Sequence, residues 1–358
     1  MPQAHDGKEQ LMAVKVLAIG DRFVLSDLIV ATLRRDVGQD LEISALDLPW
    51  PIEPFGRVAE VDEASGTEEQ VIELVGGIEV LFTHLAPITK RVLEAADALR
   101  LVVCPRGGPV NVNVEAASEA GVAVCYVPGR NAQAVAEYAL GLMLAAARRI
   151  VDGHVPLAAG EWRGEFYAYE ECGIELEGST VGIVGFGAIG SRVGRILRAF
   201  GAEVLVYDPY VDAARIGEIG GHPVGGLNEL LGRSKIVSLH ARLTDETRGM
   251  IGAEEISRMP EGSVLINTAR GGLLDYGALC DALESGHLGS AALDVYDEEP
   301  PPQGSRILSA PRIVLSPHIA GATKETAQRA VRIGAAEVKR YVIEERLVNE
   351  ASREALGL

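Results

Sequence analysis

The stretch "VGIVGFGAIGSRVGRILRAFGAEVLVYD" (residues 181–208) decides the fold of a large part of this chain. An apolar run leads into glycines spaced as GxGxxG, a helical pattern follows, and a second apolar run ends in an acidic residue. The GxGxxG string alone is weak evidence. Strand, glycine turn, helix and strand in this order are typical of a Rossmann unit that binds a dinucleotide.

Each glycine of this turn has its own physical reason. Gly185 permits the tight turn, Gly187 lets a pyrophosphate approach the backbone, and Gly190 lets the helix pack closely on the strand. The helix that starts near Ala188 and Ile189 would present free N–H groups and its positive dipole end to phosphates. A non-binding α/β domain would use these glycines for turns and packing alone, and the complete unit makes that alternative the weaker one.

Asp208 ends the second apolar run, about 20 residues beyond the glycines, where a carboxylate accepts hydrogen bonds from ribose hydroxyls. Its negative charge would also repel the 2′-phosphate of NADP. The sequence therefore predicts NAD as the cofactor.

Short apolar runs alternate with helical stretches in two separate series. The first series comprises residues 14–20, 41–47, 78–84, 99–104 and 122–128, and the second comprises 180–185, 202–208, 235–240, 263–268, 290–295 and 312–317. Nearly continuous apolar character is typical of parallel strands covered on both faces. The chain is therefore predicted to form two doubly wound α/β domains with parallel sheets.

Longer segments connect and follow these series. Residues 131–150 and 324–345 are predicted to be helices, whereas the polar, glycine-bearing stretch at 152–178 shows no clear period.

Composition excludes several classes of protein. The 358 residues suggest two domains at roughly 100–200 residues each. A net charge of −18 repels nucleic acid and anionic membranes. The start shows no secretory signal, and the most apolar helical stretch, at 139–147, is too short to span a bilayer. The four cysteines have no metal-ligand spacing, so no metal is predicted, and a cytoplasmic location with reduced thiols is expected.

Three later strands end in chemically interesting residues: Arg270 in "LINTARGG", Glu299 in "ALDVYDEEP" and His318 in "LSPHIAG". A lone histidine beside apolar residues is more often a core side chain than a catalyst. Ligands of doubly wound sheets, however, bind outside the carboxyl ends of strands. Beside a nicotinamide, the three groups would serve oxidation of a 2-hydroxy acid: the histidine accepts the hydroxyl proton, the carboxylate favours imidazolium, and the guanidinium holds the substrate carboxylate.

From about residue 14 to 345 the chain resembles the D-isomer-specific 2-hydroxyacid dehydrogenases, the family of D-3-phosphoglycerate dehydrogenase. The motifs that carry the resemblance are "VGIVGFGAIG", "NTARGGLLD", "ALDVYDEEP" and "SPHIAG", in this order. The resemblance implies that Arg270 binds substrate, Glu299 partners the histidine, and His318 is the general acid/base. His240 lacks a glutamate partner in the family pattern and is read as structural.

The resemblance also implies a domain arrangement and further cofactor contacts. A flavodoxin-like substrate domain, split between residues 14–127 and 319–358, would flank an inserted Rossmann NAD-binding domain at 128–318, with 1–13 as a flexible N-terminus. Asp294 would lie beside the nicotinamide. The remaining residues expected to line the cofactor are Ala241, Thr268, Ala269 and Gly321.

Two segments depart from the family pattern. Thr83 and His84 stand where the family usually has an Arg-Ser pair, and His84 is a candidate for touching substrate. The substrate loop, commonly GxGxDN, here reads "CPRGGPVNVN" (104–113), in which Gly107 and Gly108 can still offer N–H groups to a carboxylate.

Arg106 and Arg242 are additional to the family pattern. They either bind a phosphate or second carboxylate of the substrate or pair with surface acids, which number 51 in this chain.

The expected activity is that of an NAD-dependent D-2-hydroxyacid dehydrogenase, or 2-oxoacid reductase, acting on a small-molecule acid. Alternatives within the family are a glyoxylate/hydroxypyruvate reductase or a sugar-acid dehydrogenase. An alternative of another class is an NAD-sensing, corepressor-like binding protein. A formate dehydrogenase would carry glutamine in place of Glu299. Homodimerisation through the cofactor domain is expected, with the apolar helix near 135–147 as a contributor.

Overall fold

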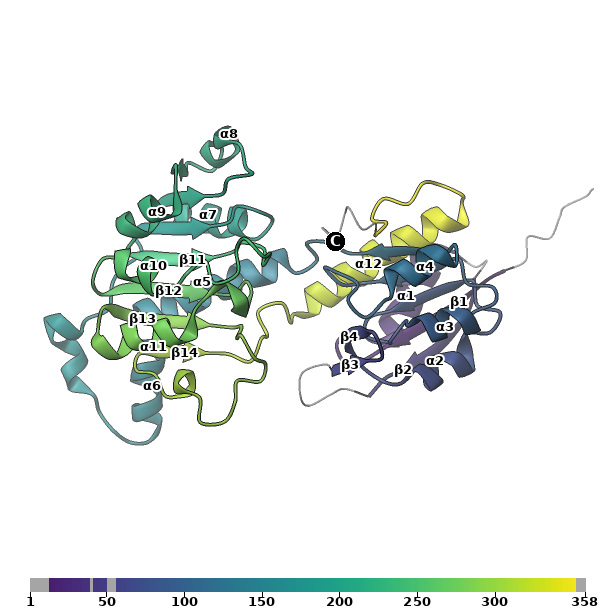
Figure 1. The fold of residues 1–358 in the computed structure, drawn as a ribbon, viewed down its shortest axis with the longest axis horizontal. Coiled ribbons are helices and arrows are strands. Elements are labelled where there is room, and N and C mark those ends of the chain that lie inside the picture. Colours follow the sequence, from purple (N-terminus) through teal and green to yellow (C-terminus); the bar gives the residue numbers. More distant parts are fainter. Residues whose placement is uncertain (1–12, 39–40, 50–55, 352–358) are drawn as a thin grey trace, which may run out of the picture. The chain divides into compact units, whose positions relative to one another are not determined.

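The structure, a computed structural model, describes residues 13–38, 41–49 and 56–351. It divides into two compact units (Figure 1): residues 1–130 with 323–358 form unit 1, and residues 131–322 form unit 2. Unit 2 therefore starts three residues later and ends four residues later than the predicted cofactor domain. The expectation of a flexible N-terminus concerns residues that, except for Ala13, lie outside the described ones.

Unit 1 is built on a sheet of parallel strands with the order β2-β1-β5-β6-β7 among the described residues. The strands are β1 (Val14–Gly20), β2 (Leu41–Asp47), β5 (Val80–Thr83), β6 (Leu101–Cys104) and β7 (Ala123–Tyr126). Counted within this sheet alone, the order is 2-1-3-4-5, as in flavodoxin-like folds. The direction of winding changes between β1 and β5, so the loops after these two strands face the place where such sheets bind ligands.

The helices of unit 1 cover the sheet on both faces. They are α1 (Ser26–Asp36), α2 (Glu68–Val75), α3 (Lys90–Ala95), α4 (Val114–Glu119) and α12 (Lys324–Val342). The last helix comes from the far end of the chain and packs against α1 and β6. It lies close to the sheet: a Cβ on its Gly334 would stand 2.6 Å from Phe82 and 2.8 Å from Val103. An antiparallel hairpin of β3 (Gly56–Val58) and β4 (Val61–Ala64), which the sequence did not predict, completes the described part of the unit.

Unit 2 contains a longer parallel sheet with the order β10-β9-β8-β11-β12-β13-β14 in the described part of the chain. Its strands are β8 (Thr180–Val184), β9 (Glu203–Tyr207), β10 (His222–Pro223), β11 (Ile236–Leu239), β12 (Ser263–Asn267), β13 (Leu288–Leu293) and β14 (Ile313–Leu315). Counted within the sheet, the order 3-2-1-4-5-6 followed by one more strand is that of the Rossmann fold. The predicted fold class is confirmed for both units.

Helices of unit 2 alternate with these strands. They are α5 (Ala132–Ala147), α6 (Ile150–Ala158), α7 (Gly190–Ala199), α8 (Ala213–Gly217), α9 (Leu227–Arg233), α10 (Ala253–Arg258) and α11 (Tyr276–Ser285). The prediction of one helix over 131–150 is wrong at its end, because Arg149 adopts a left-handed conformation (φ 54°) and separates α5 from α6. The aperiodic stretch from 152 therefore begins inside a helix, followed by 3₁₀ turns at Gly164–Tyr167 and Tyr169–Glu171.

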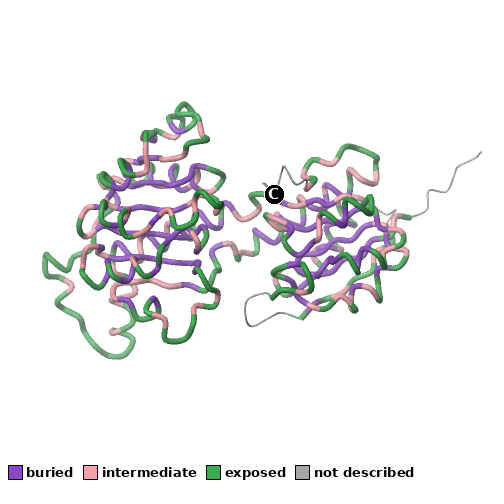
Figure 2. Tube along the Cα trace, viewed as in Figure 1, coloured by how far each residue is buried: buried purple, intermediate pink, exposed green. Residues whose placement is uncertain are grey.

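The apolar residues of α5 and those of the segment that follows it have different environments. Ala139 and Met143 of α5 are fully buried, and the helix packs against α7, β12 and β13 within unit 2. The segment at 150–169 is largely exposed (Figure 2). Its exposed large apolar side chains are Ile150, Val155, Leu157, Trp162, Tyr167 and Tyr169.

Two absences hold for the described residues only. None of their helices is long and apolar enough to cross a membrane. They also contain no group of three or more His, Cys, Asp or Glu side chains that could hold a metal ion.

A buried carboxylate ties the end of the chain to unit 1. Glu337 of α12 is fully buried and accepts hydrogen bonds from the Val348 N–H (3.0 Å), the Asn349 side-chain amide (2.6 Å) and Arg340 (2.9 Å). The anchored segment continues to the edge of the sheet, where Ala351 N–H donates to the Val124 carbonyl (2.7 Å).

Replacing Glu337 with alanine should lower the free energy of unfolding by about 2–3 kcal/mol, because buried donors then lose a charged acceptor. Urea unfolding followed by circular dichroism measures this change. Glu325→Ala, an exposed position on the same helix, is the matched control and should cost less than about 1 kcal/mol. If the two substitutions lower the free energy of unfolding equally, the buried hydrogen bonds of Glu337 contribute no more to stability than an exposed acid near the start of the helix.

Candidate active site

In the glycine turn after β8, packing within the chain explains two of the three glycines. Gly185 has φ 93°, and a Cβ there would stand 2.6 Å from the Ala241 N. A Cβ on Gly190 would overlap the Gly185 carbonyl oxygen, so this glycine is needed for close packing of α7 on β8. Gly187 is different, because a Cβ there meets no atom within 4 Å. Packing within the chain therefore does not require glycine at 187, whereas close approach of a pyrophosphate does.

Asp208, which directly follows β9, is joined to this turn. Its Oδ2 accepts a hydrogen bond from the Phe186 N–H (2.7 Å), and its Oδ1 accepts one from the Tyr210 N–H (2.9 Å). The carboxylate thereby fixes the glycine turn relative to the end of β9. The helix that follows starts at Gly190, with Ile189 as its N-cap and Ala188 before it, so its first N–H groups lie beside the turn.

Residues at the neighbouring strand ends also fit a dinucleotide. Thr268, after β12, is buried, and its hydroxyl has no hydrogen-bond partner among the residues that the structure describes. A buried hydroxyl without a partner is costly unless a ligand satisfies it. Ala269 is buried beside it, Ala241 follows β11 by two residues, and Gly321 lies so close to Asn131 that a Cβ would stand 3.0 Å from its Nδ2.

His318 and Glu299 form a hydrogen-bonded pair in unit 2. The His318 Nδ1 lies 2.7 Å from the Glu299 Oε2, and the Glu299 Oε1 accepts the Tyr296 N–H at 3.0 Å. The hydrogen bond to Glu299 raises the pKa of His318 above its usual value, against an opposing effect of burial. Burial is the largest effect on the pKa of Glu299 and pushes it upward, but the hydrogen bond and charge of His318, together with the Tyr296 N–H and Arg270, lower the net pKa below its usual value. Because Nδ1 is engaged, Nε2 is the nitrogen left for proton exchange.

The backbone of His318 is held in an uncommon conformation by Asp294. His318 has φ 53°, a left-handed conformation that side-chain-bearing residues seldom adopt and that costs of order 1 kcal/mol or more. Asp294 is buried, and it accepts hydrogen bonds from the Ile319 N–H (2.9 Å), the Ala320 N–H (2.9 Å) and the Ser316 hydroxyl (2.7 Å). These bonds fix the turn that carries the imidazole. A contact between Asp294 and the nicotinamide stays a prediction.

The two arginines of unit 2 that are predicted to bind substrate, Arg270 and Arg242, are exposed. Arg270 follows β12 and donates to the Ala269 carbonyl at 2.8 Å, and its charge slightly opposes protonation of His318. Arg242 follows β11 and forms no ion pair with any residue in the described part of the chain. Both guanidinium groups are thus available to an anion.

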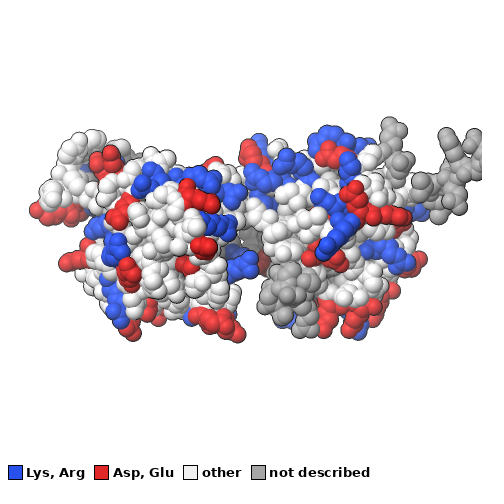
Figure 3. Space-filling model, turned by 90° about the horizontal axis from the view of Figure 1, so that it is seen from above, with Lys and Arg blue, Asp and Glu red and all other residues white. Residues whose placement is uncertain are grey.

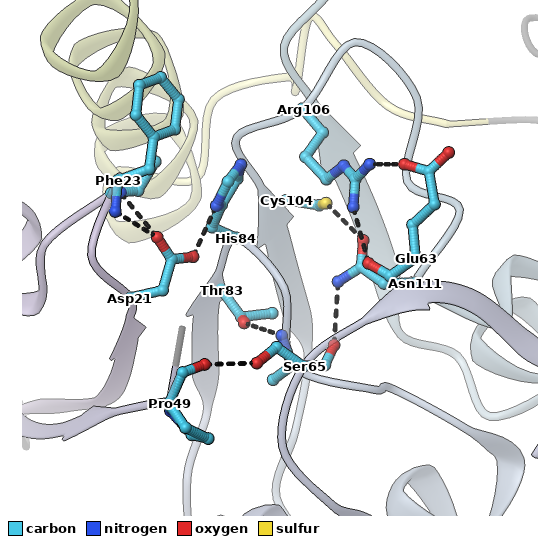
Figure 4. Close-up of polar contacts among 12 residues, drawn as sticks. Asp21, Phe23, Pro49, Glu63, Ser65, Thr83, His84, Cys104, Arg106 and Asn111 are labelled. Atoms are coloured by element: carbon cyan, nitrogen blue, oxygen red, sulfur yellow. Dashed lines mark hydrogen bonds and ion pairs between the residues drawn. The ribbon is translucent and has the colours of Figure 1, made fainter. Parts of the chain in front are cut away.

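The predicted substrate residues of unit 1 have different partners from those expected (Figure 4). His84 is buried, and its Nδ1 lies 2.6 Å from Asp21, so the expectation that it touches substrate gains no support. Arg106 donates to the backbone carbonyl of Glu63 at 3.0 Å and to its carboxylate, which is the surface-acid alternative. Gly107 and Gly108 have open space around them, since a Cβ on either meets no atom within 4 Å.

Arg106 and Glu63 form one of many ion pairs between arginines and acidic residues in the described part of the chain. On the face that Figure 3 shows, basic and acidic side chains are interspersed on each unit. In such a surface an extra arginine readily finds a carboxylate, and in this pair the Arg106 side chain is 12% exposed and the Glu63 side chain 55% exposed.

His240, the rival histidine, has a structural environment. Its Nε2 lies 2.9 Å from the Ser238 hydroxyl, and burial lowers its pKa to about 4. The ring is therefore neutral at pH 7, and burial is the only cause of its shifted pKa, so no carboxylate favours its imidazolium form.

Arg130 is a further candidate for the site, and the sequence pattern does not single it out. It ends the first segment of unit 1, its Nη2 lies 3.5 Å from the His84 Nε2, and its Nη1 is buried without a partner among the described residues. The only signal in the sequence is a cation in "PGRNA", between the two series of strands.

Comparisons with known proteins agree with this arrangement. The sequence model of the D-isomer specific 2-hydroxyacid dehydrogenase family, NAD binding domain, matches residues 140–320. D-3-phosphoglycerate dehydrogenase of Methanocaldococcus jannaschii is 37% identical over 288 residues, which cover 80% of this chain and 54% of that protein. Glyoxylate reductase of Korarchaeum cryptofilum is 37% identical over 293 residues, covering 81% of this chain and 88% of that protein.

A solved structure extends the likeness to nearly the whole chain. The TT0316 protein from Thermus thermophilus aligns with a TM-score of 0.77 and 29% identity, covering 95% of this chain and 100% of the other. The chain spans about half the length of the curated D-3-phosphoglycerate dehydrogenases that it matches. Together with the glycine turn of unit 2, these matches establish that the chain belongs to the D-isomer specific 2-hydroxyacid dehydrogenase family, with the NAD-binding domain of that family in unit 2.

Proposed function

We propose that the protein is an NAD-dependent D-2-hydroxyacid dehydrogenase that interconverts a 2-hydroxy acid and its 2-oxo acid, with His318 as general acid/base. The hydrogen bond of 2.7 Å between Glu299 and the His318 Nδ1 is the observation that supports this most. It stabilises the imidazolium form and leaves Nε2 to exchange the proton of the substrate hydroxyl.

Each residue of the set has a separate task in this proposal. Bound NADH supplies the hydride that reduces the carbonyl carbon. His318 donates its proton to the oxygen on which negative charge develops, and Glu299 stabilises the charged ring before that transfer. Arg270 binds the carboxylate through paired N–H donors, which orients the carbonyl beside the imidazole.

The substrate within this class is a separate proposal. Relatives named D-3-phosphoglycerate dehydrogenase and glyoxylate reductase are equally similar, at 37% identity. Thr83 and His84 replace the arginine and serine expected of a phosphoglycerate enzyme, so 3-phosphoglycerate is not favoured as the substrate. Glyoxylate, hydroxypyruvate or a sugar-derived 2-oxo acid fits the chain as well. Glutamate at 299 argues against a formate dehydrogenase, in which glutamine is expected.

The deciding experiment is a screen of NADH oxidation with glyoxylate, hydroxypyruvate, 3-phosphohydroxypyruvate and sugar-derived 2-oxo acids. Turnover of at least one compound supports the proposal. Binding of NADH without turnover of any of them would favour the NAD-sensing, corepressor-like alternative.

We also propose that the protein acts as a cytoplasmic homodimer. The expected contribution of the helix near 135–147 must be revised, because the buried side chains of α5 pack inside unit 2. The exposed apolar side chains at 150–169, among them Trp162 (81% exposed) and Tyr167 (94% exposed), are better suited to bury area against a second copy.

Replacing His318 with asparagine should lower kcat by about 10²–10⁴-fold, the range expected when a positioned acid/base is lost. NADH affinity should change little, because the glycine turn and Asp208 are untouched. Steady-state kinetics and fluorescence titration of NADH measure the two quantities. His240→Asn is the matched control, and near-normal turnover of the His318 variant would remove this histidine from the reaction.

The pH dependence of the rate should follow His318. Reduction needs the protonated ring, so the reductive kcat/KM should be constant at low pH and fall through a pKa above 6.5, while the oxidative rate rises over the same interval. Glu299→Gln removes the main cause of the raised pKa, so the fall should occur at lower pH. An unchanged profile in the glutamine variant would show that another group controls the titration.

The cofactor preference should depend on Asp208. Asp208→Asn keeps an acceptor for the glycine turn but removes the negative charge, so the preference for NADH over NADPH should narrow at least about tenfold, or 1.4 kcal/mol. The ratio of the two cofactor affinities, measured by fluorescence titration, tests this. If the ratio does not move, the ribose specificity is determined elsewhere.

A further inference from the structure

Unit 1 gathers polar side chains at the carboxyl end of its sheet. Asp21 directly follows β1, His84 directly follows β5, and Arg106 follows β6 by two residues. These strands are neighbours in the sheet, and the winding direction changes between β1 and β5. This edge is where open parallel sheets bind their ligands.

Asp21 and His84 of this cluster are joined by a hydrogen bond (Figure 4). Asp21 is buried and accepts from the Phe23 N–H (2.8 Å), the Val24 N–H (2.9 Å) and the His84 Nδ1 (2.6 Å). Burial is the largest effect on the pKa of His84 and, with the charges of Arg130 and Arg106, lowers it although Asp21 raises it, so the neutral ring predominates at pH 7. A neutral ring that donates from Nδ1 must accept at Nε2, and this is the nitrogen that faces Arg130 at 3.5 Å.

Arg130 is held in place on several sides. Its guanidinium carbon lies 5.7 Å from the centre of the Phe23 ring, and Arg329 of α12 donates to its backbone carbonyl at 2.6 Å. Burial, followed by the charge of Arg106, lowers the pKa of Arg130 to about 10, which still leaves it protonated at pH 7.

This positive charge has no carboxylate of its own within the described residues. Arg130 forms no ion pair there, and its Nη1 is buried without an acceptor. Asp21 is committed to His84 and two backbone amides, and Glu63 is committed to Arg106. A buried N–H donor of a charged group is costly to leave without an acceptor, and an anion is the ligand that would satisfy the Arg130 Nη1.

The open glycines beside Arg106 are a second feature of the same edge. A Cβ on Gly107 or Gly108 meets no atom within 4 Å, and neither N–H finds an acceptor in the described part of the chain. Backbone N–H groups and a guanidinium together are a common way to bind the oxygens of a carboxylate or a phosphate.

We propose that Arg130, positioned by the neutral His84 and by Asp21, is an anion-binding residue of unit 1 that recognises a second anionic group on the substrate. The proposal rests on the proposed function, in which the substrate is a 2-hydroxy or 2-oxo acid. The substrate class is then an acid with two anionic groups, of which the one that meets Arg130 is a phosphate or a second carboxylate.

Binding measured without turnover tests this directly. Isothermal titration of the full chain compares 3-phosphoglycerate with D-glycerate, and D-malate with D-lactate, so that each pair differs by one anionic group. The wild-type protein should bind the member with two anionic groups about 10- to 100-fold more tightly in one of the pairs, and that pair identifies the second group as phosphate or carboxylate. Arg130→Met should abolish the difference. Arg91→Met, at an exposed arginine of unit 1 paired with Glu68 and Glu69, is the matched control and should keep it.

The outcomes separate this inference from the proposed activity. A wild-type protein that does not distinguish the members of either pair, or an Arg130→Met variant that still does, would overturn the role of Arg130. If Arg130→Met fails to fold, Arg130→Lys replaces it in the test. Lysine keeps the charge but loses the planar guanidinium, so the ratio of affinities within the pair should fall at least about threefold. A protein that discriminates through Arg130 but turns over no 2-oxo acid would contradict the dehydrogenase activity alone.

Discussion

The turn that carries His318 depends on one buried carboxylate. Asp294 accepts the N–H groups of the two residues after His318, and this holds the histidine in a left-handed conformation that its own side chain disfavours. The imidazole is thereby presented to Glu299, which determines its tautomer and raises its pKa. The acid/base chemistry proposed for the chain rests on this arrangement, because neither the proton affinity nor the direction of Nε2 would be defined without it.

Each unit contains a histidine hydrogen-bonded to a carboxylate, and the two pairs differ in the charge of the histidine. In unit 2 the pair is partly exposed, with 48% of the His318 side chain and 27% of the Glu299 side chain accessible, and the hydrogen bond favours a charged ring. In unit 1 the His84 and Asp21 side chains are 5% and 0% exposed, and the cost of desolvation keeps the ring neutral. Burial thus decides whether a histidine exchanges protons or serves as a fixed acceptor for its neighbour.

Sequence reasoning worked where the signal is local. Strands β1 and β2 begin and end as predicted: β1 ends in Gly20 before a polar residue, and β2 begins after the polar stretch "GQD" and ends two residues before Pro49. The glycine turn and the order of Arg270, Glu299 and His318 were also readable, since each motif lies within a few residues. The end of α5 was not, because the residues on either side of Arg149 are compatible with a helix and only the backbone of that residue breaks it. The β3–β4 hairpin was missed because its strands are short and largely exposed.

The partners of Arg106 and Arg130 could not be predicted, because they come from distant parts of the chain. Arg106 and Glu63 are 43 residues apart in the chain, so no local sequence pattern predicts their pairing. The environment of Arg130, including its buried Nη1 without an acceptor among the described residues, depends on His84 from the end of β5 and on Arg329 from the far end of the chain. Because these contacts come from distant segments, the sequence near Arg130 shows only a cation in "PGRNA" and does not indicate its partners.

The titration of the His318 ring is the measurement that tests the account most directly. Nitrogen-15 labelling of the seven histidines, with His318→Asn used to assign the signal, gives its pKa and tautomer by NMR. The account predicts a pKa above 6.5 and, for the neutral ring, a proton on Nδ1. A His318 that titrates at or below 6.5, or that carries its neutral-form proton on Nε2, would contradict the central role given to Glu299.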